Sequence, residues 1–349
     1  MHIASVASAF PKYYYPQELL LSALQKYWGP KVDNPLFMER LQARIGVDGR
    51  YLVLPMTEYE GMATWGEANR HWMEAATELG EKALGCALER AGFAASDVGA
   101  IFFVSITGVC SPSIDARLVN RMGLPPSIKR IPIFGLGCVA GAAGIARAAD
   151  YVLAYPKQVA AVVSVELCSL TLQKEDLSIA NLISSGLFGD GAAAVLLSGA
   201  DLASNGPRVL ATRSIFYPDT EAVMGWDISE KGFRIVLSRE VPEVVETHLR
   251  EDVDLFLAER GMTRSDIGSW ILHTGGPRVL EATEKALELS AGALDASWTC
   301  LKRTGNLSSA SVLLVLEEVM MNRRPVPGTY SILAAMGPGF CSELVLLQW

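Results

Sequence analysis

The chain has 349 residues, which is long for one hydrophobic core and suits two domains or one large α/β unit. Half of its residues are hydrophobic and its formal net charge is −8, so a surface for nucleic acid or anionic membrane is not expected. No run of about 18 apolar residues predicts a membrane span, and the first residues lack the pattern of a signal peptide, so we expect a cytoplasmic protein.

The cysteines and histidines show no spacing typical of a metal site. The six cysteines include no CxxC pair, and scattered thiols of this kind are typical of a reduced, cytosolic protein. The four histidines form neither an HxxxH nor an HExxH pattern. The sequence therefore predicts free thiols and no bound metal.

Apolar segments rich in β-branched residues alternate with amphipathic or alanine-rich stretches in the first half of the chain. Helices are predicted over residues 73–91 and 138–154. Buried strands are predicted over residues 100–105, 129–137, 160–167 and 192–198. This alternation favours crossover connections and a mostly parallel sheet, as in an α/β fold.

A cluster of Ser, Asn, Gly and Pro at residues 204–209 predicts a boundary, which divides the chain into residues 1–205 and 206–349. The second part repeats the pattern of the first. The sequence SDVG at Ser96–Gly99 recurs as SDIG at Ser265–Gly268, in each case just before an apolar strand.

A second match in this repeat joins two strand-to-helix junctions. Gly137–Cys138 corresponds to Gly305–Asn306, at nearly the same separation along the chain as the first match. The simplest interpretation is a duplicated α/β half in which Cys138 and Asn306 lie at pseudo-equivalent helix N-termini. Such a pair can converge on one site between the halves, where sheets end and ligands commonly bind.

Cys138 lies in the sequence GLGCVAGAAG, where its neighbours are mostly glycine and alanine. At the start of a helix, exposed N–H groups favour the thiolate over the thiol. Next to an imidazolium, the pKa of such a cysteine falls from about 8.5 to roughly 4–7. The glycines would let an acyl group approach the backbone. The alternative is a small cysteine packed in the core.

His273 and Asn306 occupy comparable junctions. His273 ends the predicted strand SWILH and precedes Thr274-Gly275-Gly276, which places it above the sheet. Asn306 begins a predicted helix in RTGNLSS, where asparagine is also a good N-cap. Each residue alone has a structural explanation, as a buried histidine or as a cap. Together with Cys138 they favour a catalytic set.

Several segments resemble type III polyketide synthases, the chalcone synthase-like enzymes, in the same order and over nearly the whole chain. These segments are GLGCVAGAAGI, SGLFGDGAAAVLL, HTGGPRVLEA, RTGNLSSASVLLVLE and AMGPGF. The resemblance implies a thiolase-like α/β fold in which two pseudo-equivalent halves form a five-layered α-β-α-β-α core. It also implies a homodimer that uses coenzyme A thioesters and needs no separate cofactor.

The resemblance also implies roles for the three residues. Cys138 would carry an acyl starter from acyl-CoA, while His273 and Asn306 would bind the thioester oxygen of malonyl-CoA. Decarboxylation gives an enolate, and one hydrogen-bond donor to such an oxygen is worth about 3–4 kcal/mol. Repeated condensation and cyclisation would give a pyrone, a resorcinol or a related small phenolic product. His273 is also expected to keep Cys138 ionised.

Further residues follow from the resemblance at matching positions. Phe188 matches a phenylalanine between the CoA tunnel and the cavity, and its alternative is an ordinary core aromatic. The residues expected to bind CoA are Arg40, Arg44, Gly275, Gly276 and Arg278. For Arg40 and Arg44 the alternative is a solvated surface pair. Residues expected to line the cavity are Ser111, Cys168, Trp226, Ile235, Ser308 and Pro338.

The sequence departs from plant chalcone synthases at some of these positions. Trp226 replaces a glycine and should narrow or reroute the cavity, so a chalcone product is not expected. Ser111–Pro112 matches a Met-Pro step that is cis in the family and whose methionine enters the partner's cavity. Asp190, in GDG, is expected to be a turn residue and not a catalytic one.

Three other functions are compatible with parts of the pattern. A β-ketoacyl-acyl carrier protein synthase III shares the fold and the residue set, but usually has HQAN where this chain has HTGGP. A papain-like cysteine peptidase has Cys, His and Asn in the same chain order, but its CGSCW context and secretory signal are missing from this sequence. A non-catalytic acyl-CoA-binding homologue is the third alternative.

Overall fold

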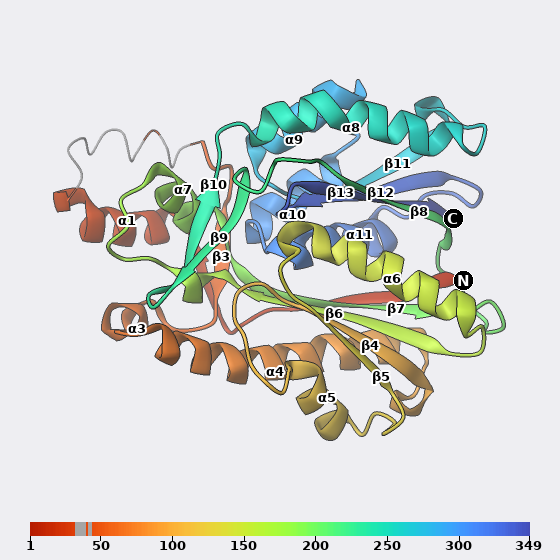
Figure 1. Cartoon of the computed structure of the whole chain (residues 1–349), viewed down its shortest axis with the longest axis horizontal. Coiled ribbons are helices and arrows are strands. Elements are labelled where there is room, and N and C mark those ends of the chain that lie inside the picture. The colour runs from red at the N-terminus through yellow and green to blue at the C-terminus, as the bar shows by residue number, and fades with distance from the viewer. Residues whose placement is uncertain (32–39, 41–43) are drawn as a thin grey trace.

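The computed structural model describes residues 1–31, 40 and 44–349. Its main feature is a nine-stranded sheet with the order β11-β12-β13-β8-β1-β7-β6-β4-β5 (Figure 1). The strands of this sheet are β1 (His2–Ala9), β4 (Val98–Val104), β5 (Lys129–Ile133), β6 (Val159–Leu167), β7 (Asp190–Ser198), β8 (Arg208–Phe216), β11 (Ile267–Leu272), β12 (Tyr330–Gly337) and β13 (Cys341–Gln348).

The sheet consists of two half-sheets that meet where β1 pairs with β8, at His2 and Arg208. In the first half-sheet β4 is parallel to β6, β6 is antiparallel to β7, and β7 is antiparallel to β1. The second repeats this order, with β11 parallel to β12, β12 antiparallel to β13, and β13 antiparallel to β8. The predicted internal repeat is therefore present in the topology. The prediction of a mostly parallel sheet is wrong, because five of the eight neighbouring strand pairs are antiparallel and three are parallel.

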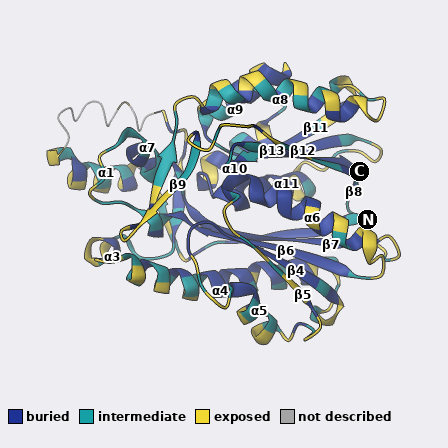
Figure 2. Cartoon of the chain, in the orientation of Figure 1, coloured by how far each residue is buried: buried dark blue, intermediate teal, exposed yellow. Residues whose placement is uncertain are grey.

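Helices form three layers around the two half-sheets. The helices α6 (Ala140–Ala154) and α11 (Ser311–Asn322) lie between the half-sheets and share one hydrophobic cluster with both. The helices α4 (Trp65–Ala91) and α5 (Ile114–Met122) cover the outer face of the first half-sheet, and α8 (Val241–Ala258) and α9 (Pro277–Leu287) cover the second (Figure 1). The result is the predicted five-layered α-β-α-β-α core, and Figure 2 shows its strands and central helices to be mostly buried.

The central layer is tightly packed where the two halves meet. A Cβ atom on Gly141 of α6 would overlap the carbonyl oxygen of Ser309, which lies in the 3-10 turn η6 (Ser308–Ala310) before α11. Glycine at this position therefore allows the starts of α6 and α11 to approach each other. Both helices begin at the same place in the molecule, between the two half-sheets.

Most elements predicted in the first half of the chain are present, with small differences in their ends. The predicted helices correspond to α4, which begins earlier, and to α6. The strand predicted over residues 129–137 is wrong in length and burial, because β5 ends at Ile133 and its residues are exposed or half-buried. It pairs with β4 at the edge of the sheet, so no second neighbour covers it. The predicted division between residues 205 and 206 stays a prediction.

Smaller elements lie beside the carboxyl ends of the central strands. They are β2 (Tyr13–Pro16), α1 (Gln17–Trp28), β3 (Gly49–Leu52), α3 (Met56–Gly61), α7 (Ile179–Leu187), β9 (Met224–Ser229), β10 (Gly232–Leu237) and α10 (Asp295–Thr304). Within the described residues, no helix has the length and apolar character needed to cross a membrane.

Candidate active site

Cys138 lies at the middle of the 3-10 turn η3 (Gly137–Val139), which leads directly into α6. It is buried, with 7% of its surface exposed, and its Sγ lies 3.7 Å from the Oγ of Ser308. Gly137 has a positive φ of 53°, and a Cβ atom there would lie 2.8 Å from the ring of Pro338. The small residue before Cys138 therefore has both a conformational and a packing reason.

His273 follows the last residue of β11, as the sequence predicts. Its backbone N–H donates to the carbonyl oxygen of Ala334 in β12 at 3.0 Å, so the strand pairing fixes its position. The side chain is buried, and neither ring nitrogen has a hydrogen-bond partner among the residues that the structure describes. Buried polar atoms normally have partners. Both nitrogens are therefore available to a ligand.

The amide of Asn306 is oriented by its own surroundings. Its Oδ1 accepts hydrogen bonds from the Ser308 backbone N–H at 2.8 Å and from the Ser311 hydroxyl at 3.4 Å. Its Nδ2 lies 3.4 Å from the carbonyl oxygen of Gly275, a weak contact. Because the oxygen is held by the start of the helix, the NH2 group is the end of the amide that is free to donate to a ligand.

The predicted equivalence of Cys138 and Asn306 needs a correction in register. Cys138 occupies the middle of η3 before α6, whereas the middle of η6 before α11 is Ser309. Asn306 lies before η6 and is not an N-cap of α11. The predicted strand before Asn306 is also wrong, because the helix α10 ends at Thr304. The second junction contains more residues before its central helix begins, which displaces the match.

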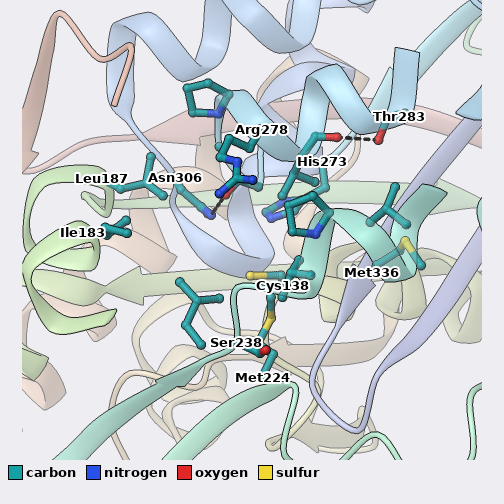
Figure 3. Close-up of a pocket in the computed structure, with 18 of the residues that line it drawn as sticks. Cys138, Ile183, Leu187, Met224, Ser238, His273, Arg278, Thr283, Asn306 and Met336 are labelled. Carbon is teal, nitrogen blue, oxygen red and sulfur yellow. Dashed lines mark hydrogen bonds between the residues drawn. The ribbon is translucent and has the colours of Figure 1, made fainter. Parts of the chain in front are cut away.

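Cys138, His273 and Asn306 line one cavity of about 720 Å³ (Figure 3). Cys138 reaches it from the first half of the chain, and His273 and Asn306 reach it from the second half. Much of the remaining wall is apolar, and its members include Ile183, Leu187, Val245, Leu249, Met336 and Phe340. The structure therefore brings together the three residues singled out in the sequence.

Three arginines also line this cavity and are exposed to solvent: Arg44, Arg239 and Arg278. None of them forms an ion pair with a described residue. Gly275 and Gly276 lie beside Arg278 at the start of α9, also in the cavity wall. Sequence reasoning missed Arg239, because nothing local to β10 and α8 indicates that their junction faces the cavity. Arg40 is exposed, but the shared helix face predicted for it includes residues 41–43, which lie outside the described residues.

A second, smaller cavity of about 40 Å³ is lined by Cys168, Trp226 and Ile235. Phe188 lines both cavities and therefore separates them. Trp226 lies opposite Ile235 in the β9–β10 pair, and its ring packs at 5.9 Å from that of the buried Phe233. Three of the residues predicted to line a cavity, Cys168, Trp226 and Ile235, thus border this side chamber and not the larger cavity.

Other predicted cavity residues have different environments. Ser308 touches the sulfur of Cys138 and has a positive φ of 46°, which is uncommon for a residue with a side chain. Pro338 packs against Gly137 and is not among the residues that line the larger cavity, where Met336 lies instead. Ser111 is exposed, and its peptide bond to Pro112 is cis as the resemblance implies.

Burial decides the protonation of the site. Burial raises the pKa of the Cys138 thiol to about 12, opposed by the Ser308 hydroxyl and supported by the charge of Glu166. Burial lowers the pKa of His273 to about 4. These shifts favour the neutral thiol and the neutral imidazole, whereas the sequence predicts that His273 keeps Cys138 ionised. The local helix-start pattern gave no information on how deeply the thiol is buried.

The sequence did not predict the buried, hydrogen-bonded positions of two carboxylates, those of Glu166 and Asp190. Glu166 of β6 accepts hydrogen bonds from the Thr107 hydroxyl at 2.9 Å, from the Ile106 N–H at 3.1 Å and from the Ser309 hydroxyl. Asp190 is not a turn residue. It begins β7 and its carboxylate accepts from the N–H groups of Val53 and Ser169, both at 2.8 Å. Burial raises the pKa of both carboxyls, that of Asp190 to about 6.

Within the described residues, no group of three His, Cys, Asp or Glu side chains is arranged to hold a metal ion. The groups that the cavity offers include a thiol, an imidazole and an amide, with cationic groups at the wall.

Comparison with known proteins gives consistent matches over the whole chain. The N-terminal domain of the chalcone and stilbene synthases matches residues 52–202, and the C-terminal domain matches residues 208–349. A 1,3,6,8-tetrahydroxynaphthalene synthase from Streptomyces peucetius subsp. caesius is 50% identical, covering 99% of this chain and 93% of that relative. A phloroglucinol synthase from Pseudomonas fluorescens is 31% identical, covering 97% of each chain.

The fold matches as well. The crystal structure of 1,3,6,8-tetrahydroxynaphthalene synthase from Streptomyces coelicolor A3(2), described as a bacterial type III polyketide synthase, superposes with a TM-score of 0.96. It is 32% identical and covers 100% of this chain and 99% of that one. These matches favour the polyketide synthase over the peptidase and over the carrier-protein-dependent synthase. The chain therefore belongs to the chalcone and stilbene synthase family, and it is a type III polyketide synthase, an acyltransferase-type condensing enzyme.

Proposed function

We propose that Cys138 carries an acyl starter and that malonyl-CoA is condensed onto it repeatedly, with loss of CO2, before the chain cyclises to a small phenolic product. The observation that carries this proposal is the cavity itself. It combines one thiol with two groups able to donate hydrogen bonds, His273 and Asn306. The thiol comes from the first half of the chain and the two donors come from the second half.

In the loading step, Cys138 begins as a neutral thiol and His273 as a neutral imidazole. His273 accepts the proton of the Cys138 thiol as the sulfur attacks the thioester carbon of acyl-CoA. The new carbon–sulfur bond forms, the bond to the CoA sulfur breaks, and the proton passes from His273 to the departing CoA thiolate. A histidine that is neutral near pH 7 is in the unprotonated form that a general base needs in order to accept a proton.

In the condensation step, charge develops on the thioester oxygen of malonyl-CoA. As CO2 leaves, Asn306 Nδ2–H and a His273 ring N–H donate to this oxygen and stabilise the enolate. The enolate carbon attacks the Cys138 thioester, a carbon–carbon bond forms, and the Cys138 thiolate leaves. The extended chain is now a CoA thioester, and the Cys138 sulfur attacks its thioester carbon and releases CoA before the next round. Since Asn306 Oδ1 is already bonded to Ser308 and Ser311, little reorganisation is needed.

Coenzyme A would enter along the cavity wall that carries the arginines. Arg44, Arg239 and Arg278 have no described ion-pair partner and suit phosphate groups, for which guanidinium is a good ligand. The apolar wall suits the pantetheine arm and the growing chain. With coenzyme A thioesters as substrates, the proposed reaction needs no metal or redox cofactor. A homodimer in the cytoplasm is part of the proposal.

The starter is proposed to be small, with malonyl-CoA alone sufficient. The relatives named for tetrahydroxynaphthalene and phloroglucinol make compact polyhydroxylated aromatics, whose oxygens on alternate carbons are the pattern left by a poly-β-ketone. The chamber behind Phe188 is only about 40 Å³ and is bordered by Trp226, which supports a compact product.

The test is incubation of the purified protein with malonyl-CoA alone and with a panel of short, aromatic and long acyl-CoAs, with products identified by mass spectrometry. A polyhydroxylated aromatic from malonyl-CoA alone is expected. Consumption of malonyl-acyl carrier protein but not malonyl-CoA would instead favour a carrier-protein-dependent synthase. Labelled acyl-CoA that binds but never becomes attached to the protein would favour a non-catalytic binder.

A further inference from the structure

Arg50 of β3 is a buried arginine outside the cavity, with 3% of its surface exposed. Its Nη1 donates to the carbonyl oxygens of Ser185 at 2.8 Å and Phe188 at 2.6 Å. Its Nε donates to Oε1 of Gln17 at 3.2 Å, and Gln17 Nε2 donates to the carbonyl oxygen of Gly186 at 2.7 Å. Together the two side chains satisfy carbonyls at the end of α7, which have no partner inside the helix.

The aliphatic part of Arg50 lies against two glycines, one next to Phe188 and one next to Asn306. A Cβ atom on Gly189, which follows Phe188, would lie 3.4 Å from the Cβ of Arg50. A Cβ atom on Gly305, which precedes Asn306, would lie 3.0 Å from the Cδ of Arg50. One side chain therefore touches both the segment that carries Phe188 and the segment that carries Asn306.

These two segments are also joined directly. The Asn306 N–H donates to the carbonyl oxygen of Leu187 at 2.9 Å, and the Gly189 N–H donates to the carbonyl oxygen of Asn306 at 3.0 Å. Phe188 and Asn306 thus form an isolated parallel bridge between the two halves of the chain. Any shift of the end of α7 would be transmitted to the backbone of Asn306.

The charge of Arg50 is retained at neutral pH. Burial lowers the pKa of Arg50 only to about 10, and the nearby carboxylate of Asp190 opposes the shift. Burial of a charged group is costly unless it is well hydrogen-bonded. The planar guanidinium reaches Gln17 and two carbonyls at once, which a lysine ammonium on a flexible stem cannot reproduce.

We propose that Arg50 is a positioning residue, which holds the bridge between Phe188 and Asn306 so that the Asn306 amide faces the thioester oxygen. This inference rests on the proposed function of Asn306. Arg50 itself does not touch the substrate. Its effect should therefore fall on the step that uses Asn306 and not on the acylation of Cys138, because misplacement of a catalytic group by about 1 Å can cost about 100-fold in rate.

The variant Arg50→Lys tests this by two rates measured on the same preparation. Decarboxylation of malonyl-CoA is expected to fall about 10- to 100-fold. Single-turnover acylation of Cys138 by an acyl-CoA is expected to change by no more than about twofold per active molecule, since that step does not use Asn306. The ratio of the two rates is the measured quantity, and a purely structural loss would lower both equally.

Arg264→Lys is the matched control. Arg264 likewise donates from Nη1 to a carbonyl at a helix end, that of Leu287 in α9, and pairs with Asp254 at 2.8 Å. It lies outside the cavity wall. This variant should lower thermal stability without changing the ratio of decarboxylation to acylation.

If Arg50→Lys does not fold, Gln17→Leu removes one member of the same hydrogen-bond set and should lower the ratio several-fold. An unchanged ratio in the folded variant, or equal losses in both rates, would overturn the role of Arg50. Failure of the unmodified protein to decarboxylate malonyl-CoA would instead count against the proposed function.

Discussion

The two halves of the chain share a scaffold but differ in chemistry. Each half places a 3-10 turn directly before a central helix, and the two turns, η3 and η6, meet at the centre of the molecule. The middle of η3 is Cys138, which faces the cavity. The middle of η6 is Ser309, whose hydroxyl bonds to Ser164 at 2.8 Å and to Glu166, away from the cavity.

This difference shows which part of the repeat is architectural. The duplicated junction brings two helix starts together, but only one supplies a nucleophile. The second half contributes Asn306, which lies before η6, and His273, which follows β11. The first half also has a strand, β5, beyond β4, whereas the part of the chain that the structure describes places no strand beyond β11. The two similar scaffolds therefore supply different functional groups, and substitutions can remove each functional group separately.

The largest expected effect is in the first half. Cys138→Ala should abolish covalent loading by acyl-CoA, because Cys138 is the one thiol among the described residues that line the larger cavity. Mass spectrometry of the intact protein after incubation with acyl-CoA measures this directly. Cys168→Ala is the control, since Cys168 borders the smaller chamber, and it should still load. A stable acyl adduct on the Cys138→Ala protein would contradict the assignment.

The corresponding change in the second half should separate the two steps. Asn306→Asp keeps the size and an acceptor for Ser308 N–H but removes the donor Nδ2–H. Decarboxylation of malonyl-CoA should fall about 100- to 1,000-fold, the usual loss of one oxyanion donor. Acylation of Cys138 should fall much less. Equal losses in both assays would argue against a role for Asn306 at the thioester oxygen.

The buried imidazole of the second half predicts a pH dependence of stability. Because burial lowers the pKa of His273 to about 4, its unfolded form binds a proton below pH 6.5 that the folded form does not. Stability present above this range is therefore lost as the pH falls towards the folded pKa, by about 2–3 kcal/mol. Urea unfolding at pH 7.5 and 4.5 measures this loss. His273→Gln, which does not titrate, should lose that much less, and identical losses in the two proteins would show that the imidazole is not buried neutral.

The smallest effect concerns the seam between the halves. Gly141→Ala would bring a methyl group against the Ser309 carbonyl and should lower the free energy of unfolding by about 1–3 kcal/mol. Gly85→Ala in α4 is the control, because a Cβ there meets no atom within 4 Å, and it should stabilise by about 0.5–1 kcal/mol. Thermal unfolding compares the two. A stabilised Gly141→Ala protein would mean that α6 and η6 can separate without cost.

Periodicity and repetition predicted much of the fold from the sequence. The predicted helix over residues 138–154 and the strand over residues 160–167 lie close to α6 and β6, because buried elements carry continuous apolar patterns. The repeated SDVG and SDIG sequences mark equivalent turns before β4 and β11. The edge position of β5 could not be predicted, since its apolar residues do not reveal how many strands flank it.

The candidate site was predicted in its centre and less well at its borders. Cys138, His273 and Asn306 were found because each lies beside glycine at a predicted junction between two elements, although the element before Asn306 is the helix α10 and not a strand. Arg239 and Arg50 were missed because their roles depend on contacts with segments far away in the sequence. The protonation of Cys138 was predicted in the wrong direction for the same reason, since burial by distant segments outweighs the local helix start.

The meeting of η3 and η6 has an electrostatic consequence. The helices α6 and α11 begin beside each other, so the positive ends of their peptide dipoles point towards a common region. Two like poles repel, and the Glu166 carboxylate, which accepts a hydrogen bond from Ser309 of η6, lies beside them. A thiolate or an enolate formed there would act as a counter-ion for both helices. The architecture therefore favours each anionic intermediate, whichever half of the chain holds it.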